Sequence, residues 1–159
     1  RIMTNAFWDD IFKYSKKKSD IQILEDIPVF KGLSRFELNK VAKMLHLRSY
    51  KKDEYIFHEK EPGESMYIIK SGEILITKNK NQKETVISNL TEGSFFGEVS
   101  LVDEDVRSAN AKAITDSEVL GFFRADLMNL IDRNPRLACF ILYQLSTVIG
   151  KRLRLQTET

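Results

Sequence analysis

Cysteine is nearly absent from this sequence, which carries Cys139 alone among its 159 residues. One thiol can form neither an internal disulfide framework nor a cysteine-based zinc cluster. Chains without disulfides are typical of reducing compartments, so the sequence predicts an intracellular, cytoplasmic protein. Because Cys139 has apolar neighbours in a helical pattern, we predict a buried and unreactive thiol.

Long apolar runs are absent as well. No stretch approaches the roughly 18 apolar residues of a membrane span. Near the start, Phe7-Trp8 is followed directly by Asp9-Asp10, where a secretory signal would need an apolar run. We therefore expect no membrane segment within this chain, while 42% hydrophobic residues supply a core for one domain.

Neither sign of charge dominates, since 25 lysines and arginines oppose 23 acidic residues for a net charge of +2. Such a balance gives no overall field to attract nucleic acid, and we expect no nucleic-acid partner within this chain. The sequence also shows no nucleophile–base pair and no Walker-type loop. His46 and His58 lie far from any second type of metal ligand, so we expect neither an enzyme nor a metal site.

Helical patterns occupy the first part of the chain. Apolar residues recur at helical spacing within residues 5–26, where Ser19 or Asp20 could cap a second short helix. Ser34 and Glu37 have the S-x-x-E spacing of a capping box, in which each side chain accepts a hydrogen bond from the other residue's backbone amide. An apolar face follows, and we predict a helix over residues 35–45.

From Leu47 to Phe123 the apolar pattern changes to period two. Short runs rich in β-formers are separated by turn signals at spacings near ten residues. This pattern predicts an antiparallel sandwich or barrel, and the connections are too short for the crossover helices of a parallel sheet. The runs are Tyr55–His58, Met66–Ile69, Ile74–Thr77, Val86–Ser88 and Glu118–Phe122.

Helical patterns return at the end of the chain. They predict a helix over residues 124–132 and another over 135–155, which Asn134-Pro135 begins in the favoured N-cap and N1 arrangement. The apolar stripe of the last helix is broad enough to touch the barrel and a second partner, which could be another copy of the chain in a homodimer. Its closing Lys151-Arg152-Leu153-Arg154 places cations at the negative end of the helix dipole.

Residues that suit an anion site gather between Gly93 and Ala113. Gly97 permits a positive φ or a close approach of the backbone to a ligand, and amides of the following turn can donate to an anion. Arg107 could reach the same anion with its planar fork. Glu98 only accepts hydrogen bonds, so it suits the hydroxyls of a sugar. Together these groups fit a compact sugar phosphate.

The run Phe96-Gly97-Glu98, with Leu101 and then Arg107-Ser108-Ala109 after a fixed gap, resembles the phosphate-binding cassette of cyclic nucleotide-binding domains. We call residues 96–109 the cassette. The resemblance covers about residues 20–155 and implies an α+β fold, an antiparallel β-roll or jelly-roll-like barrel with flanking N-terminal helices and a C-terminal lid helix. We expect an N-terminal helical extension over 1–19 and the nucleotide-binding domain over 20–159.

The resemblance also implies a ligand, cAMP or cGMP, with cAMP favoured on family frequency, and a role for each cassette residue. In the family the glutamate binds the ribose 2′-hydroxyl and the arginine binds the cyclic phosphate. The chain would then act as a ligand-sensing regulatory module for an effector that the sequence does not identify. An alternative is a degenerate domain of the same fold that serves as a protein-interaction module. The implied ligand-binding residues are Ile76, Leu90, Phe96, Gly97, Glu98, Val99, Ser100, Arg107, Ser108 and Ala109.

Three carboxylates, Asp103-Glu104-Asp105, lie inside the cassette and would disfavour an anion if they faced it. We hypothesise that Asp103 or Glu104 pairs with Arg107 in the empty pocket and that ligand displaces it. Taken singly, the motif residues also have structural explanations: Arg107 could pair with Asp105, Glu98 could favour a helix N-terminus, and Gly97 could serve a turn.

Overall fold

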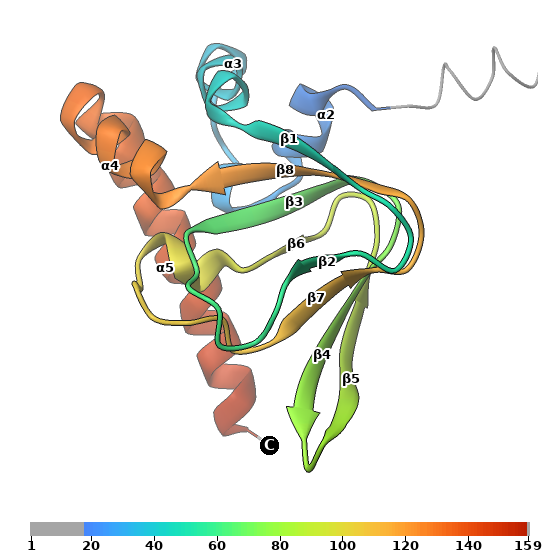
Figure 1. Cartoon of the computed structure of the whole chain (residues 1–159). Coiled ribbons are helices and arrows are strands. Elements are labelled where there is room, and N and C mark those ends of the chain that lie inside the picture. The colour runs from blue at the N-terminus through green and yellow to red at the C-terminus, as the bar shows by residue number, and fades with distance from the viewer. Residues whose placement is uncertain (1–17, 159) are drawn as a thin grey trace, which may run out of the picture.

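The computed structural model describes residues 18–158, and the helical pattern predicted before residue 18 lies outside them. Helices stand before and after the strands, as predicted (Figure 1). They are α2 (Asp20–Glu25), the 3-10 turn η1 (Pro28–Phe30) and α3 (Arg35–Met44) before the strands, and α4 (Arg124–Arg133) and α5 (Pro135–Thr157) after them. The boundary between residues 1–19 and 20–159 stays a prediction.

Between the helices the chain folds into two sheets of four strands each, which confirms the predicted β-roll. All strand pairs are antiparallel. One sheet has the order β1-β8-β3-β6, formed by His46–Tyr50, Ser117–Phe123, Ser65–Ser71 and Phe95–Phe96. The other has the order β2-β7-β4-β5, formed by Tyr55–Phe57, Asn110–Ala113, Ile74–Lys80 and Lys83–Leu90.

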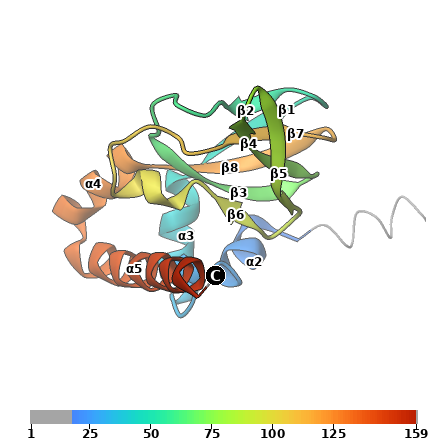
Figure 2. The ribbon, with the colours of Figure 1, turned by 90° about the horizontal axis from the view of Figure 1, so that it is seen from below.

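Strand β3 separates two parts of the hydrophobic core. Because side chains alternate between the two faces of a strand, Met66 and Ile68 pack among apolar side chains of α2, α3, α4 and α5. Tyr67 and Ile69 point to the other face and pack between the sheets with Ala111. Helices α2, α3 and α5 accordingly lie on one side of the β3–β8 layer (Figure 2).

Capping boxes position the first two α-helices of the described chain. The Ser34 hydroxyl accepts from the backbone amide of Glu37 at 3.2 Å, and the Glu37 carboxylate accepts from the amide of Ser34 at 3.0 Å. Ser19 and Gln22 form the same reciprocal pair at α2. The predicted caps and the helix behind Ser34 are therefore confirmed.

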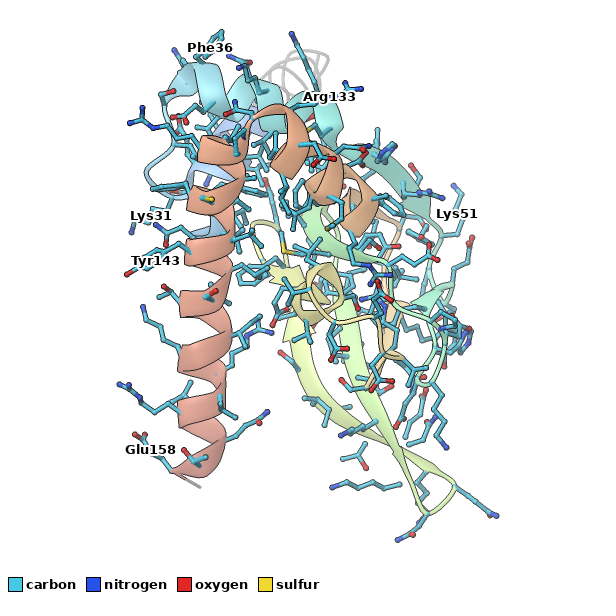
Figure 3. The ribbon with its side chains drawn as sticks, turned by 90° about the vertical axis from the view of Figure 1, so that its left-hand side faces the viewer. Lys31, Phe36, Lys51, Arg133, Tyr143 and Glu158 are labelled. Carbon is cyan, nitrogen blue, oxygen red and sulfur yellow. The ribbon has the colours of Figure 1, made fainter. Side chains whose placement is uncertain are left out.

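Helix α5 begins where predicted, since the Asn134 side chain accepts from the backbone amide of Leu137. The predicted buried thiol is wrong: Cys139 is exposed, because it points away from the side of α5 that faces the core. Tyr143 is 73% exposed and points away from the strands (Figure 3). No helix within residues 18–158 combines the length and apolarity that crossing a membrane needs.

We predict that Ser34→Ala lowers the free energy of unfolding by about 1 kcal/mol, because α3 loses its N-cap acceptor. The hydrogen bond from the Ser34 amide, together with that from its hydroxyl, lowers the pKa of Glu37. A pKa lowered by folding gives stability that is present at neutral pH and lost as the pH falls through that lowered value.

Urea unfolding at neutral and acidic pH measures both effects. Ser49→Ala, at an exposed position of β1, is the matched control and should change stability by less than about 0.5 kcal/mol. Glu37→Gln should lose less stability than the wild type on acidification. A Ser34→Ala protein as stable as the wild type at neutral pH would show that the cap is not needed.

Candidate functional site

A cavity of about 610 Å³ opens between the β4–β5 hairpin, the cassette and the C-terminal part of α5. All ten residues singled out in the sequence line it, so the fold brings the predicted site together in one place. Their roles as ligand contacts stay predictions. They are Ile76, Leu90, Phe96, Gly97, Glu98, Val99, Ser100, Arg107, Ser108 and Ala109.

Gly97 shapes the start of the cassette. It adopts φ +76°, in the left-handed region, and directly precedes the 3-10 turn η2 (Glu98–Leu101). A Cβ atom at this position would lie 2.5 Å from Nη1 of Arg107 and 3.2 Å from the carbonyl oxygen of Ser65. Glycine is therefore required here both by the backbone conformation and by the space that Arg107 occupies.

Arg107 is buried, with 6% of its surface exposed, and its guanidinium is held by neutral oxygens. Nη1 donates to the Ser100 hydroxyl at 3.0 Å and to the Gly97 carbonyl at 3.3 Å. Nη2 donates to the carbonyl and hydroxyl of Ser65, at 2.7 and 3.3 Å. The guanidinium also lies over the ring of Phe57, 4.1 Å from its centroid.

The Arg107 charge has no carboxylate within ion-pair distance among residues 18–158. Its buried Nε–H also lacks an acceptor in that part of the chain. Burial lowers the pKa of the Arg107 guanidinium, although an arginine stays charged at any physiological pH. The site thus holds a buried cation that polar neighbours orient but do not neutralise.

The hypothesis that Asp103 or Glu104 pairs with Arg107 is wrong for this structure, and so is the alternative pair with Asp105. Asp103 instead accepts from the backbone amide of Asp105 at 2.9 Å, and Asp105 accepts from the amide of Val106 at 2.7 Å. These short-range bonds hold the Asp103 and Asp105 side chains against their own loop. The hypothesis was based on the closeness of these carboxylates to Arg107 in sequence. It did not consider that nearby backbone amides compete for the same carboxylates.

Glu98 is the second buried charge of the cavity, with 2% of its surface exposed. Its Oε1 atom accepts from Nη1 of Arg152, and the two side chains form an ion pair between η2 and α5. Arg152 also lies over the ring of Phe95, 5.2 Å from its centroid. The end of α5 is therefore joined to the cassette at the carboxylate predicted to bind ribose.

Sequence reasoning assigned Arg152 only to the helix dipole and missed this contact. A signal was present in the spacing, because Ile149, Arg152, Leu153 and Gln156 occupy one helical face and all line the cavity. Phe57 and Ile87 were also missed, although both line the cavity from expected strands. None of the three adjoins the cassette in sequence, so the glycine-to-arginine motif could not reveal them.

The histidines pair with carboxylates outside the cavity: His46 with Asp126 at 3.1 Å and His58 with Glu61 at 2.8 Å. Within residues 18–158 no cluster of His, Cys, Asp and Glu side chains could hold a metal ion.

Comparison with known proteins identifies the family. The family model described as "Cyclic nucleotide-binding domain" matches residues 47–134, which is more than half of the chain. The chain belongs to the cyclic nucleotide-binding domain family. The matched residues run from β1 to the end of α4 and include the whole cassette.

Relatives of this cyclic nucleotide-binding domain occur in larger proteins. It is 34% identical over 128 residues to the cyclic AMP receptor protein of Thermus thermophilus, across 80% of this chain and 57% of that protein. It is 28% identical over 106 residues to the cAMP-dependent protein kinase regulatory subunit of Hypocrea atroviridis, across 67% of this chain and 22% of that protein.

Among solved structures, the catabolite activator protein of Thermus thermophilus matches with a TM-score of 0.75 at 32% identity, over 82% of this chain and 60% of that chain. The chain thus spans less than two thirds of the length of these relatives.

We predict that Arg152→Ala loosens the end of α5, because the ion pair with Glu98 is lost. Amide hydrogen exchange over residues 150–157 in the ligand-free protein should rise roughly tenfold, equivalent to about 1.4 kcal/mol in the opening equilibrium. Arg154→Ala is the matched control, since Arg154 is exposed on the same helix and outside the cavity lining. Equal exchange in the two variants would mean that the pair does not hold α5.

Proposed function

We propose that this domain binds a cyclic nucleotide, cAMP in preference to cGMP, and acts as a ligand-sensing regulatory module through movement of α5. The observation that carries the proposal is the buried Arg107 guanidinium, which lines the cavity and has only neutral oxygens as hydrogen-bond partners in the described chain. Removing a cation from water costs several kcal/mol unless an anion compensates it. A cyclic phosphate bound in the cavity would supply the missing negative charge.

The ribose would lie toward Glu98. A carboxylate repels a phosphate but accepts hydrogen bonds from hydroxyl groups, so it suits the 2′-hydroxyl next to the cyclic phosphate. Ser108 is exposed in the cavity, where its hydroxyl could reach the phosphate or the edge of a guanine. Gly97, Val99, Ser100 and Ala109 would contribute backbone contacts around the phosphate.

The base would lie against the apolar wall of the β4–β5 hairpin, which presents Ile76, Ile87 and Leu90 to the cavity. Opposite this wall stands the α5 face that carries Ile149 and Leu153. A volume of about 610 Å³ is within the range of small-molecule sites. The names of both relatives refer to cyclic AMP, which supports cAMP as a ligand, whereas cGMP-dependent protein kinases that match the chain at 31% and 33% identity support cGMP.

Movement of α5 would carry the signal. Arg152 already joins this helix to Glu98, so a ligand that competes for or adds to this carboxylate changes how α5 is held. A ligand shifts such an equilibrium only by the difference in its affinity for the two positions of the helix. We retain a homodimer through α5 as a proposal, supported by Tyr143 and Leu155, which are exposed on this helix and do not line the cavity.

The alternative, a domain that serves as an interaction module without ligand, is favoured by one observation. Asp103 and Asp105 line the cavity, and their charges would weaken the binding of an anion. Calorimetric titration of nucleotide-stripped protein with cAMP and then cGMP separates the two functions. One-site binding of either nucleotide supports the sensor, and no binding with no thermal stabilisation supports the interaction module.

We predict that Arg107→Ala weakens cyclic-nucleotide binding by about 2–5 kcal/mol, because the phosphate loses a desolvated charge partner. Calorimetry with the ligand preferred by the wild type gives the change. Arg107→Lys keeps the positive charge but lacks the planar guanidinium. Its comparison with Arg107→Ala separates a loss of binding from a loss of folding. Arg48→Ala, on exposed β1, is the control, and wild-type affinity in Arg107→Ala would place the anion elsewhere.

Glu98→Gln is expected to weaken cAMP binding and to reduce the preference for cAMP over 2′-deoxy-cAMP, because the ribose hydroxyl loses its charged acceptor. Titration of both nucleotides into both proteins yields the two ratios. An unchanged ratio would mean that Glu98 does not contact the 2′-hydroxyl.

A further inference from the structure

Arg124, the first residue of α4, joins three separate segments of backbone around the cassette. Its Nη1 atom donates to the carbonyl oxygens of Ser100 at 2.8 Å, Gly63 at 3.1 Å and Asp103 at 3.2 Å. Its backbone amide donates to the Glu64 carbonyl at 2.9 Å. One side chain thus holds the loop before β3, the turn η2 and the acidic loop together.

The position of Arg124 in its own helix does not explain it. The N-terminus of a helix carries partial positive charge, so a cation in the first turn of α4 is electrostatically unfavourable there. The carbonyls at the C-terminal end of η2 carry partial negative charge. Ser100, whose carbonyl accepts from Arg124, is the penultimate residue of that turn. The charge of Arg124 is matched to the cassette rather than to α4.

Ser100 connects Arg124 with Arg107. Its hydroxyl accepts from Nη1 of Arg107 while its carbonyl accepts from Nη1 of Arg124. Gly63 packs directly against both residues. A Cβ atom at this position would lie 2.2 Å from the Ser100 hydroxyl and 3.2 Å from Nε of Arg107. Ser100 is thus the shared hydrogen-bond partner of Arg107 and of the first residue of α4.

Helix α4 is directly continuous with α5, since only Asn134 separates the two helices. Leu127 and Leu130 of α4 share one buried cluster with Leu101 of η2 and with Leu137 and Ile141 of α5. Close-packed side chains of this kind move together rather than independently.

We propose that Arg124 is a positioning residue that couples the cassette to α4 and thereby to α5. The coupling rests on the proposed function, whereas the positioning of the cassette does not depend on any ligand. Arg124 itself would not contact the nucleotide. It would determine whether a rearrangement of the groups that do contact the nucleotide also moves α5.

The test compares Arg124→Gln with the matched control Arg133→Gln at the exposed end of α4. Amide hydrogen exchange of residues 98–103 in the ligand-free proteins reports the anchoring of η2. A fluorophore on the native Cys139, the only cysteine and exposed on α5, reports movement of that helix when cAMP or cGMP is added. Calorimetry gives the affinity of the same samples.

We expect Arg124→Gln to raise the exchange of residues 98–103 about tenfold and to abolish most of the Cys139 signal, while affinity falls less than about tenfold. Arg133→Gln should match the wild type in all three. Arg124→Lys should restore most of the protection, because an ammonium offers three N–H donors to the three carbonyls.

Unchanged exchange of residues 98–103 in Arg124→Gln would overturn the positioning role. A Cys139 signal of wild-type amplitude at saturating nucleotide would overturn the coupling. A wild-type protein that binds neither nucleotide would overturn the proposed function and the coupling, and the exchange experiment would then decide the positioning role by itself.

Discussion

The architecture of this site depends on a buried guanidinium without a neutralising carboxylate in the described chain. Arg107 is oriented by Gly97, Ser65 and Ser100 and by the ring of Phe57. Two of these partners are themselves held by the fold: Gly97 has a left-handed backbone conformation, and Ser65 occupies the first ladder position of β3. The fold therefore keeps a charge in place where hydration is lost, which is the arrangement that an anion receptor needs.

Two arginines link this centre to the last two helices by different routes. Arg152 reaches from α5 to the Glu98 carboxylate, an ion pair between side chains. Arg124 reaches from α4 to backbone carbonyls of η2 and its surroundings. Both members of the first contact line the cavity, whereas Arg124 itself does not and reaches the lining only through the carbonyls of Ser100 and Asp103.

Much of this could be predicted from the sequence where the physical cause is local. The Ser34–Glu37 box, the Asn134 cap, the period-two strands and the left-handed Gly97 each depend on residues within a few positions of one another. The Arg152–Glu98 pair could not be predicted this way, because it joins residues 54 positions apart. The acidic loop was misjudged because its carboxylates bind nearby amides, and Cys139 because an apolar neighbourhood in sequence did not indicate the buried side of the helix.

The most direct test of the central claim is the NMR resonance of the Arg107 Nε–H group, whose buried donor has no acceptor in the described part of the chain. It should be recorded during titration with cAMP and, separately, with adenosine, which shares the base and ribose but lacks the phosphate. We expect cAMP to shift this resonance in proportion to occupancy and adenosine to leave it unchanged. A resonance that does not move while cAMP saturates the protein would contradict the assignment of Arg107 as the phosphate receptor.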